Sequence, residues 1–178
     1  MQKDFVLEGA PMMVKGALGI IDNIKEVLEE FRKKKAPIFH IVRVHRPDGS
    51  DVEVTRKDKF RKKAFAVVGT KGAEIIDDIK PKGAEYLVKK IRMSSFMNTD
   101  LDYMLRSLEI KNLVLTGIQT PNCIRATAFD AMAYNYNTYL VEDASAAQTM
   151  EIHQANILDM KNIGTNIIKA SDAKNLLG

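Results

Sequence analysis

The chain has 178 residues, 46% of them hydrophobic, which is enough for one buried core and too few for two ordinary domains. We therefore expect a single domain over residues 1–178. Lys and Arg number 27 against 23 Asp and Glu, a net charge of +4. The basic segment 56–63 is expected to be a solvated face or loop. The basic stripe with interleaved aromatic residues that favours nucleic-acid binding is missing.

The cysteine content and the hydropathy narrow the class of protein further. Cys123 is the only cysteine, which excludes an intramolecular disulfide framework. No apolar run approaches the roughly 20 residues needed to cross a bilayer, and no signal-peptide pattern is present. We therefore expect a cytoplasmic protein that binds neither membranes nor nucleic acids.

The first half of the chain alternates helical and extended patterns with irregular segments. Residues 48–68 are charged and irregular and predict no regular element. The predicted elements are a loop over 1–14, an amphipathic helix from 17 to 35, a strand over 38–44, a short strand over 86–88 and a helix over 100–108.

The second half has the clearer pattern, in which strands and helices alternate without a break. The predicted elements are a strand over 112–116, a helix over 123–134, a strand over 138–141, a helix over 149–163 and a strand over 165–169. Apolar strands separated by helices predict an α/β fold in three layers, an open and mostly parallel sheet with helices on both faces.

Four chemically useful residues follow predicted strands, at the sheet edge where such folds place their sites: His45, Lys90, Cys123 and Asp143. We expect them to face one cleft. A thiol in the first turn of a helix is favoured as thiolate by the helix dipole, and the free N–H groups of that turn can bind an oxyanion. Cys123 therefore has the position of a nucleophile, although a lone cysteine is equally compatible with a small buried hydrophobe.

Five motifs in order along the chain resemble those of one family, the isochorismatase-like cysteine hydrolases, which include nicotinamidases, N-carbamoylsarcosine amidases and ureidoacrylate amidohydrolases. The motifs are MQKDFV at 1–6, HRPDGSD at 45–51, GTKGAEI at 69–75, KIRMSSF at 90–96 with NTDL at 98–101, and TGIQTPNC at 116–123. The resemblance covers nearly the whole chain and implies the same three-layer, Rossmann-like fold.

The resemblance also implies roles for individual residues. Cys123 is the expected nucleophile and Lys90, two residues before Arg92, the basic residue beside it, the alternative for Lys90 being a surface lysine. A cis peptide bond is expected between Ile118 and Gln119, with the N–H groups of Gln119 and Cys123 forming the oxyanion hole. Two further aromatic residues, Phe5 and Phe96, match positions that line the pocket, though either fits an ordinary core.

The sequence departs from the family at its start. The family has a catalytic Asp at the end of a central first strand, immediately before the position of Met1, and neither the strand nor the Asp is in this sequence. Either the protein begins upstream of Met1, or the fold tolerates the gap and Cys123 is activated by Lys90 and the helix dipole alone. Loss of that central strand would leave the two neighbouring strands with unpaired backbone groups unless another segment takes its place.

Metal binding is not expected, although His45, Asp48 and Asp51 lie in the loop where nicotinamidases hold a metal, because a site with a single His is poor. The other histidines, His40 and His153, are expected to be structural, and no cofactor is expected.

The leading functional hypothesis is a cysteine-dependent hydrolase of a small amide, ureide or carbamoyl compound, acting through a covalent acyl-enzyme. A positive cleft rim would suit a neutral or anionic substrate. The alternative is a non-catalytic or impaired family member that serves as a binding or oligomeric domain. Isochorismate cleavage is a lesser alternative, because that reaction needs no thiol. The resemblance implies a homodimer or larger homo-oligomer.

Overall fold

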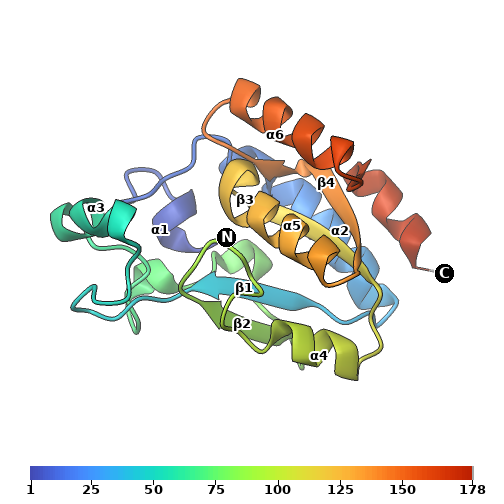
Figure 1. Cartoon of the computed structure of the whole chain (residues 1–178), viewed down its shortest axis with the longest axis horizontal. Coiled ribbons are helices and arrows are strands. Elements are labelled where there is room, and N and C mark those ends of the chain that lie inside the picture. The colour runs from blue at the N-terminus through green and yellow to red at the C-terminus, as the bar shows by residue number, and fades with distance from the viewer. Residues whose placement is uncertain (178) are drawn as a thin grey trace.

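The computed structural model describes residues 1–177 and confirms the predicted α/β class (Figure 1). Its strands all pair in parallel. The helices are α1 Lys3–Val6, α2 Ile21–Lys33, α3 Lys57–Lys62, α4 Leu101–Ser107, α5 Arg125–Ala133 and α6 Met150–Asn162, and the strands are β1 Phe39–Arg43, β2 Tyr86–Lys90, β3 Asn112–Ile118, β4 Asn137–Ala146 and β5 Asn166–Ile168.

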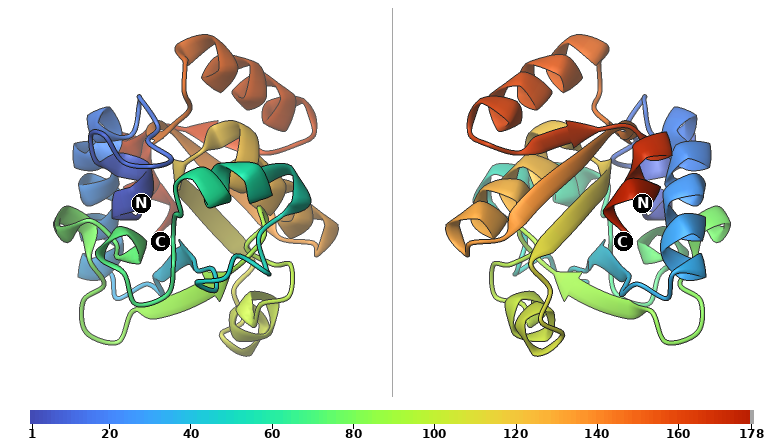
Figure 2. Two further views of the ribbon diagram at one scale, coloured as in Figure 1. Left: turned by 90° about the vertical axis from the view of Figure 1, so that its left-hand side faces the viewer. Right: turned by 90° about the vertical axis from the view of Figure 1, so that its right-hand side faces the viewer.

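The strands form the middle of three layers (Figure 2). On one face lie α2 and a 3-10 segment, η6 Ala170–Leu176, and on the other α4, α5 and α6. Helix α2 buries Ile24 and Val27 against the sheet, as its apolar spacing predicts. Helix α6 begins after Thr149, whose hydroxyl accepts a hydrogen bond from the N–H of Ile152 at 3.2 Å and so satisfies a free donor of the first turn.

The middle layer is divided into two sheets. Strand β1 pairs only with β2, whereas β3, β4 and β5 form a second sheet in that order. Among the described residues, β1 and β3 each therefore have one paired edge and one edge without a strand partner, as expected if a central strand is missing. The space between these edges is part of a cavity of about 290 Å³, and its apolar walls include Phe39, Ile41, Leu113 and Leu115. We call this apolar part, between β1 and β3, the slot.

One end of the slot is closed by the side chain of Gln2. Its Nε2 donates to the carbonyl of Arg43 at 2.7 Å, and its Oε1 accepts from the N–H of Arg43, also at 2.7 Å. The amide thus pairs with the free edge of β1 as a neighbouring strand would. The pairing holds the N-terminal segment at the carboxyl ends of the strands, and places the Met1 side chain in the cavity beside Gly117.

Two irregular regions are more ordered than their sequences predict. Residues 1–14 include the one-turn helix α1. Residues 48–68 include α3, which buries Phe60 against Phe65 with ring centroids 5.4 Å apart. Both depend on tertiary packing, which periodicity over so few residues does not reveal. None of the helices within residues 1–177 has the length and hydropathy needed to span a membrane.

Candidate active site

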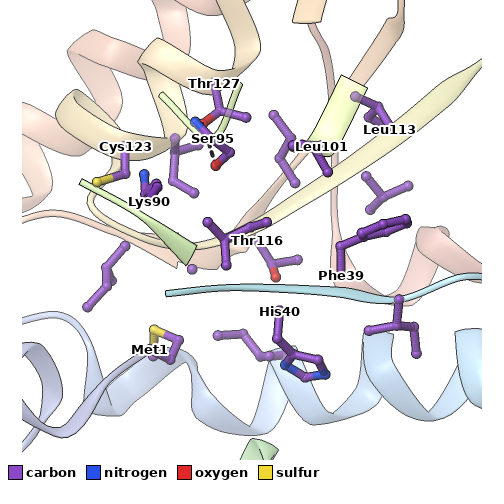
Figure 3. A pocket seen from close by; sticks show the side chains of 18 of the residues that line it. Met1, Phe39, His40, Lys90, Ser95, Leu101, Leu113, Thr116, Cys123 and Thr127 are labelled. Atoms are coloured by element: carbon purple, nitrogen blue, oxygen red, sulfur yellow. Dashed lines mark hydrogen bonds between the residues drawn. The ribbon is translucent and has the colours of Figure 1, made fainter. Parts of the chain in front are cut away.

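The polar end of the cavity lies at the carboxyl ends of the strands. Cys123 follows β3, and Lys90 and Arg43 are the last residues of β2 and β1. The side chains of Cys123 and Lys90 lie next to each other (Figure 3). The parallel strands therefore bring together residues that are 33 positions or more apart in the sequence, at the edge where open α/β sheets form their sites.

Cys123 lies in a tight turn that other residues hold in place. The turn is a π-helical segment, Thr120–Ile124, that leads directly into α5. The hydroxyl of the fully buried Thr120 lies 2.8 Å from Nδ1 of His153 on α6, and the carbonyl of Gln119 accepts from the N–H of Ile124 at 3.2 Å. The peptide bond between Ile118 and Gln119 is cis. The hydrogen bonds of Thr120 and Gln119 hold the turn that carries Cys123 at the polar end of the cavity.

Among the cations, Lys90 has the largest effect on the thiol, and it is itself buried, with only 6% of its surface exposed. Its ammonium donates a hydrogen bond to the carbonyl of Met93. Burial lowers the pKa of Lys90, while the attraction of Cys123 opposes that change and the repulsion of Arg43 adds to it. The outcome is an ammonium with a pKa below its ordinary value.

The thiol of Cys123 is shifted in the direction that favours the thiolate. Burial alone would raise its pKa, but the positive charges of Lys90, Arg43 and Arg56 outweigh burial and bring the pKa below its ordinary value. The sulfur and the Lys90 nitrogen therefore form a thiolate–ammonium pair more readily than two isolated groups would.

The backbone of the turn also offers a donor. Within residues 1–177, no backbone or side-chain oxygen accepts a hydrogen bond from the N–H of Gln119. The carbonyl of Gln119, in contrast, accepts two hydrogen bonds, from the N–H groups of Asn122 and Ile124. A free N–H close to a nucleophile is the kind of donor that can bind a developing oxyanion.

Two arginines and a glutamate, Arg43, Arg56 and Glu53, complete the polar end, and none of them was predicted from the sequence. Arg43 is almost fully buried, and its Nη1 donates to both carboxylate oxygens of Glu53, at 2.6 and 2.8 Å. Arg56 lines the cavity, so the expectation that 56–63 is a solvated face is wrong for Arg56 and for the buried Phe60. Arg43 had a detectable signal, since a charged residue inside an apolar strand run is rare.

The aromatic residues named from the resemblance both line the cavity. Phe5 also packs edge-on against Phe65, with centroids 6.1 Å apart, and Phe96 lies against Tyr136 at 5.9 Å. Each ring is therefore a wall of the cavity and a part of the core.

Two residues expected in the cleft do not line the cavity, so that prediction is wrong for both. His45 is buried, with Nδ1 3.2 Å from Oδ1 of Asp51 and its ring edge-on to Phe65. Asp143 lies inside β4, which continues five residues beyond the predicted end, and its Oδ1 accepts from the N–H of Ala170 at 2.8 Å. Both side chains are used to hold the fold together. Within residues 1–177 no three His, Cys, Asp or Glu side chains gather closely enough to hold a metal ion.

Comparison with known proteins identifies the class. The family model described as the isochorismatase domain matches residues 1–172, so the chain belongs to the isochorismatase family. Among curated proteins it is 44% identical over 168 residues to a probable inactive nicotinamidase of Arabidopsis thaliana, covering 92% of this chain and 86% of the relative. It is 29% identical over 164 residues to the ureidoacrylate amidohydrolase RutB of Agrobacterium fabrum, covering 82% of this chain and 72% of the relative.

A solved structure agrees with this assignment. The fold is similar, with a TM-score of 0.95, to an isochorismatase family protein from Desulfovibrio vulgaris that is 40% identical, covering 99% of this chain and 94% of the other. The family includes amide hydrolases, as the names of the relatives show.

Proposed function

We propose that the chain is a cysteine-dependent hydrolase of a small amide, ureide or carbamoyl compound. The observation that carries this proposal is that Cys123 and the buried Lys90 lie next to each other in a cavity of about 290 Å³. A buried cation next to a thiol in an enclosed site is typical of a nucleophilic cysteine.

The chemistry follows from the charges of the pair. The thiolate of Cys123 attacks the carbonyl carbon of the substrate, so that a C–S bond forms and the carbonyl oxygen becomes negative. The N–H groups of Gln119 and Cys123 are the donors proposed for that oxygen. When the C–N bond breaks, the ammonium of Lys90 supplies the proton with which the nitrogen leaves as an amine or ammonia. Water then attacks the thioester, its proton returns to Lys90, and the acid and the thiolate are released.

The walls of the cavity limit the substrate to a small molecule. Phe5 and Phe96 are the proposed apolar contacts on either side of the reacting carbonyl. The volume of about 290 Å³ is at the lower limit for ligand pockets, which typically occupy roughly 300–1,000 Å³.

A second candidate function is binding without turnover. Within residues 1–177, none of the side chains that line the cavity is acidic, so the cavity contains no carboxylate that could act as a general base. The similarity to a probable inactive nicotinamidase favours the same alternative. In that case the pocket would retain its ligand but release no product.

Ammonia release from a panel of small amides and ureides, with Cys123→Ser as the matched control, separates the two candidates. A hydrolase gives release that Cys123→Ser lowers by about 10³-fold or more, because a hydroxyl beside Lys90 is a far weaker nucleophile than a thiolate. Equal release by the two proteins, or none from either, would contradict the proposal.

A further inference from the structure

Arg56 is a charged residue of the cavity that the proposed reaction does not use. It ends the 3-10 turn Val54–Arg56, and its backbone N–H donates to the carbonyl of Glu53 at 2.8 Å. Helix α3 follows immediately and is anchored by the buried Phe60. The side chain is partly buried and lines the same cavity as Cys123. Arg56 is therefore held at the site by packed structure.

The guanidinium of Arg56 has no hydrogen-bond or ion-pair partner among residues 1–177. The carboxylate near it is Glu53, and both oxygens of Glu53 already accept hydrogen bonds from Arg43. A guanidinium has five N–H donors. Those of Arg56 are not cut off from solvent, so they are available to a ligand that enters the cavity. The missing acceptor is one that a ligand can supply.

The charges of the side chains around the cavity also favour a ligand with a negative group. The cationic side chains that line it are Arg43, Arg56 and Lys90, and no acidic side chain of the described residues lines it. Glu53 neutralises Arg43, and the thiolate of Cys123 neutralises Lys90. Among the side chains that line the cavity, Arg56 is the cation left without an anionic partner when the site is empty, and a neutral amide would not supply one.

We propose that the substrate carries a carboxylate in addition to its scissile amide or ureide, and that Arg56 binds this carboxylate. The planar fork of a guanidinium matches a carboxylate through two parallel hydrogen bonds. A single free arginine in a small cavity with aromatic walls fits a short carboxylate better than a phosphate, whose binding favours a cluster of cations. The inference rests on the proposed amide hydrolysis, since it names the class of substrate for the same site. The carboxylate is bound and takes no part in the reaction.

Pairs of short amides that differ only in a terminal carboxylate or methyl group, such as succinamate and butanamide, test the inference. With the native protein, kcat/KM is expected to be about 30-fold or more higher for the carboxylate partner, equivalent to a charge-assisted pair. In Arg56→Gln this ratio is expected to fall close to one, mainly through a higher KM for the carboxylate partner. Arg61→Gln is the control, because Arg61 lies on the same segment but is exposed and paired with Asp58.

The possible failures are distinguishable. If both partners are hydrolysed at similar rates, or if the preference survives in Arg56→Gln, the carboxylate inference is wrong while the proposed hydrolysis stands. If neither partner is hydrolysed, the proposed hydrolysis fails, and calorimetric titration of Cys123→Ser with succinate decides the inference alone. Binding that is lost when Arg56→Gln is added to Cys123→Ser supports the carboxylate site, and no binding, or binding that persists, overturns it.

Discussion

The two ends of the cavity differ in how their polar groups are satisfied. At the polar end, charged side chains from separate elements neutralise one another: Lys90 with Cys123, and Arg43 with Glu53. In the slot, the walls are apolar side chains, and the facing edges of β1 and β3 have no strand partner within residues 1–177. Backbone groups at such edges need partners, and apolar walls do not supply them.

The polar end is therefore expected to determine the chemistry of the protein, and the slot to determine its free energy of unfolding. The polar end is assembled by the turn after β3, by the last residues of β1 and β2, and by the segment after β1 that contains Glu53 and Arg56. The slot forms the centre of the middle layer, where a parallel α/β fold normally has its most protected strands. Changes at the polar end are therefore expected to alter chemistry, and changes in the slot to alter the free energy of unfolding.

Filling the slot is expected to have the largest effect. Met1 lies at the carboxyl ends of β1 and β3. A segment added before Met1 would therefore end at this point, and the residues preceding its end could lie between the two strands. An apolar segment of about seven residues that ends in Asp is expected to raise the free energy of unfolding by about 2–3 kcal/mol, because burial and strand pairing there exceed the ordering cost. The same segment is expected to raise ammonia release by about 10²–10⁴-fold, because the Asp adds a general base.

Two matched extensions separate the effect on the free energy of unfolding from the effect on ammonia release. A Gly/Ser segment of equal length is the control for stability, and a segment ending in Asn is the control for catalysis. Urea unfolding measures the first effect and kcat the second. If the apolar and Gly/Ser segments give the same unfolding curve, the slot does not bind a strand.

Removing the cation beside the thiol is expected to have the next largest effect. Lys90→Met keeps the length of the side chain but removes the charge that holds the thiolate, and kcat/KM is expected to fall by about 10²–10³-fold. The acidic limb of the pH–rate profile is expected to move to higher pH, because the pKa of Cys123 rises when the positive charge at position 90 is removed. Lys89→Met is the control, because Lys89 is exposed. Equal losses in the two variants would show that Lys90 has no special role.

A smaller effect, on the free energy of unfolding, is expected from the cluster of Arg32, His40 and Glu85 beside the slot. Glu85 accepts from Arg32 at 2.6 and 3.0 Å and lies 2.7 Å from His40, a cavity-lining residue of β1. Mainly through the hydrogen bonds with Arg32, the pKa of Glu85 falls to about 2. Because the folded pKa is the lower one, its contribution to stability is complete above the unfolded value near 4.5 and is lost as the pH falls toward 2.

Glu85→Gln therefore lowers the free energy of unfolding at pH 7 by about 2 kcal/mol, and this difference shrinks below pH 4.5. Urea unfolding at several pH values measures the difference. Glu26→Gln, at an exposed position on α2, serves as the control. A difference that is the same at pH 7 and at pH 2.5 would rule out ionisation of Glu85 as its source.

The sequence predicted what depends on local pattern, and it missed what depends on packing between distant segments. Strand and helix periodicity located most elements, and the strand ends pointed to Lys90 and Cys123. The same rule failed for Asp143, because an apolar run cannot show where β4 ends once the strand carries polar residues. Arg56 was missed because a charged, aperiodic segment gives no sign that it folds back over the cavity.

If Cys123 is held as a reactive thiolate, the rate at which iodoacetamide alkylates it must depend on pH with a lowered midpoint. The chain has one cysteine, so the label reports on this site alone. We expect the alkylation rate to reach half its maximum at a pH below about 8.5, the ordinary pKa of a cysteine thiol. A midpoint at or above that value, with the slow alkylation of an ordinary buried thiol, would show that Cys123 is not held as a thiolate.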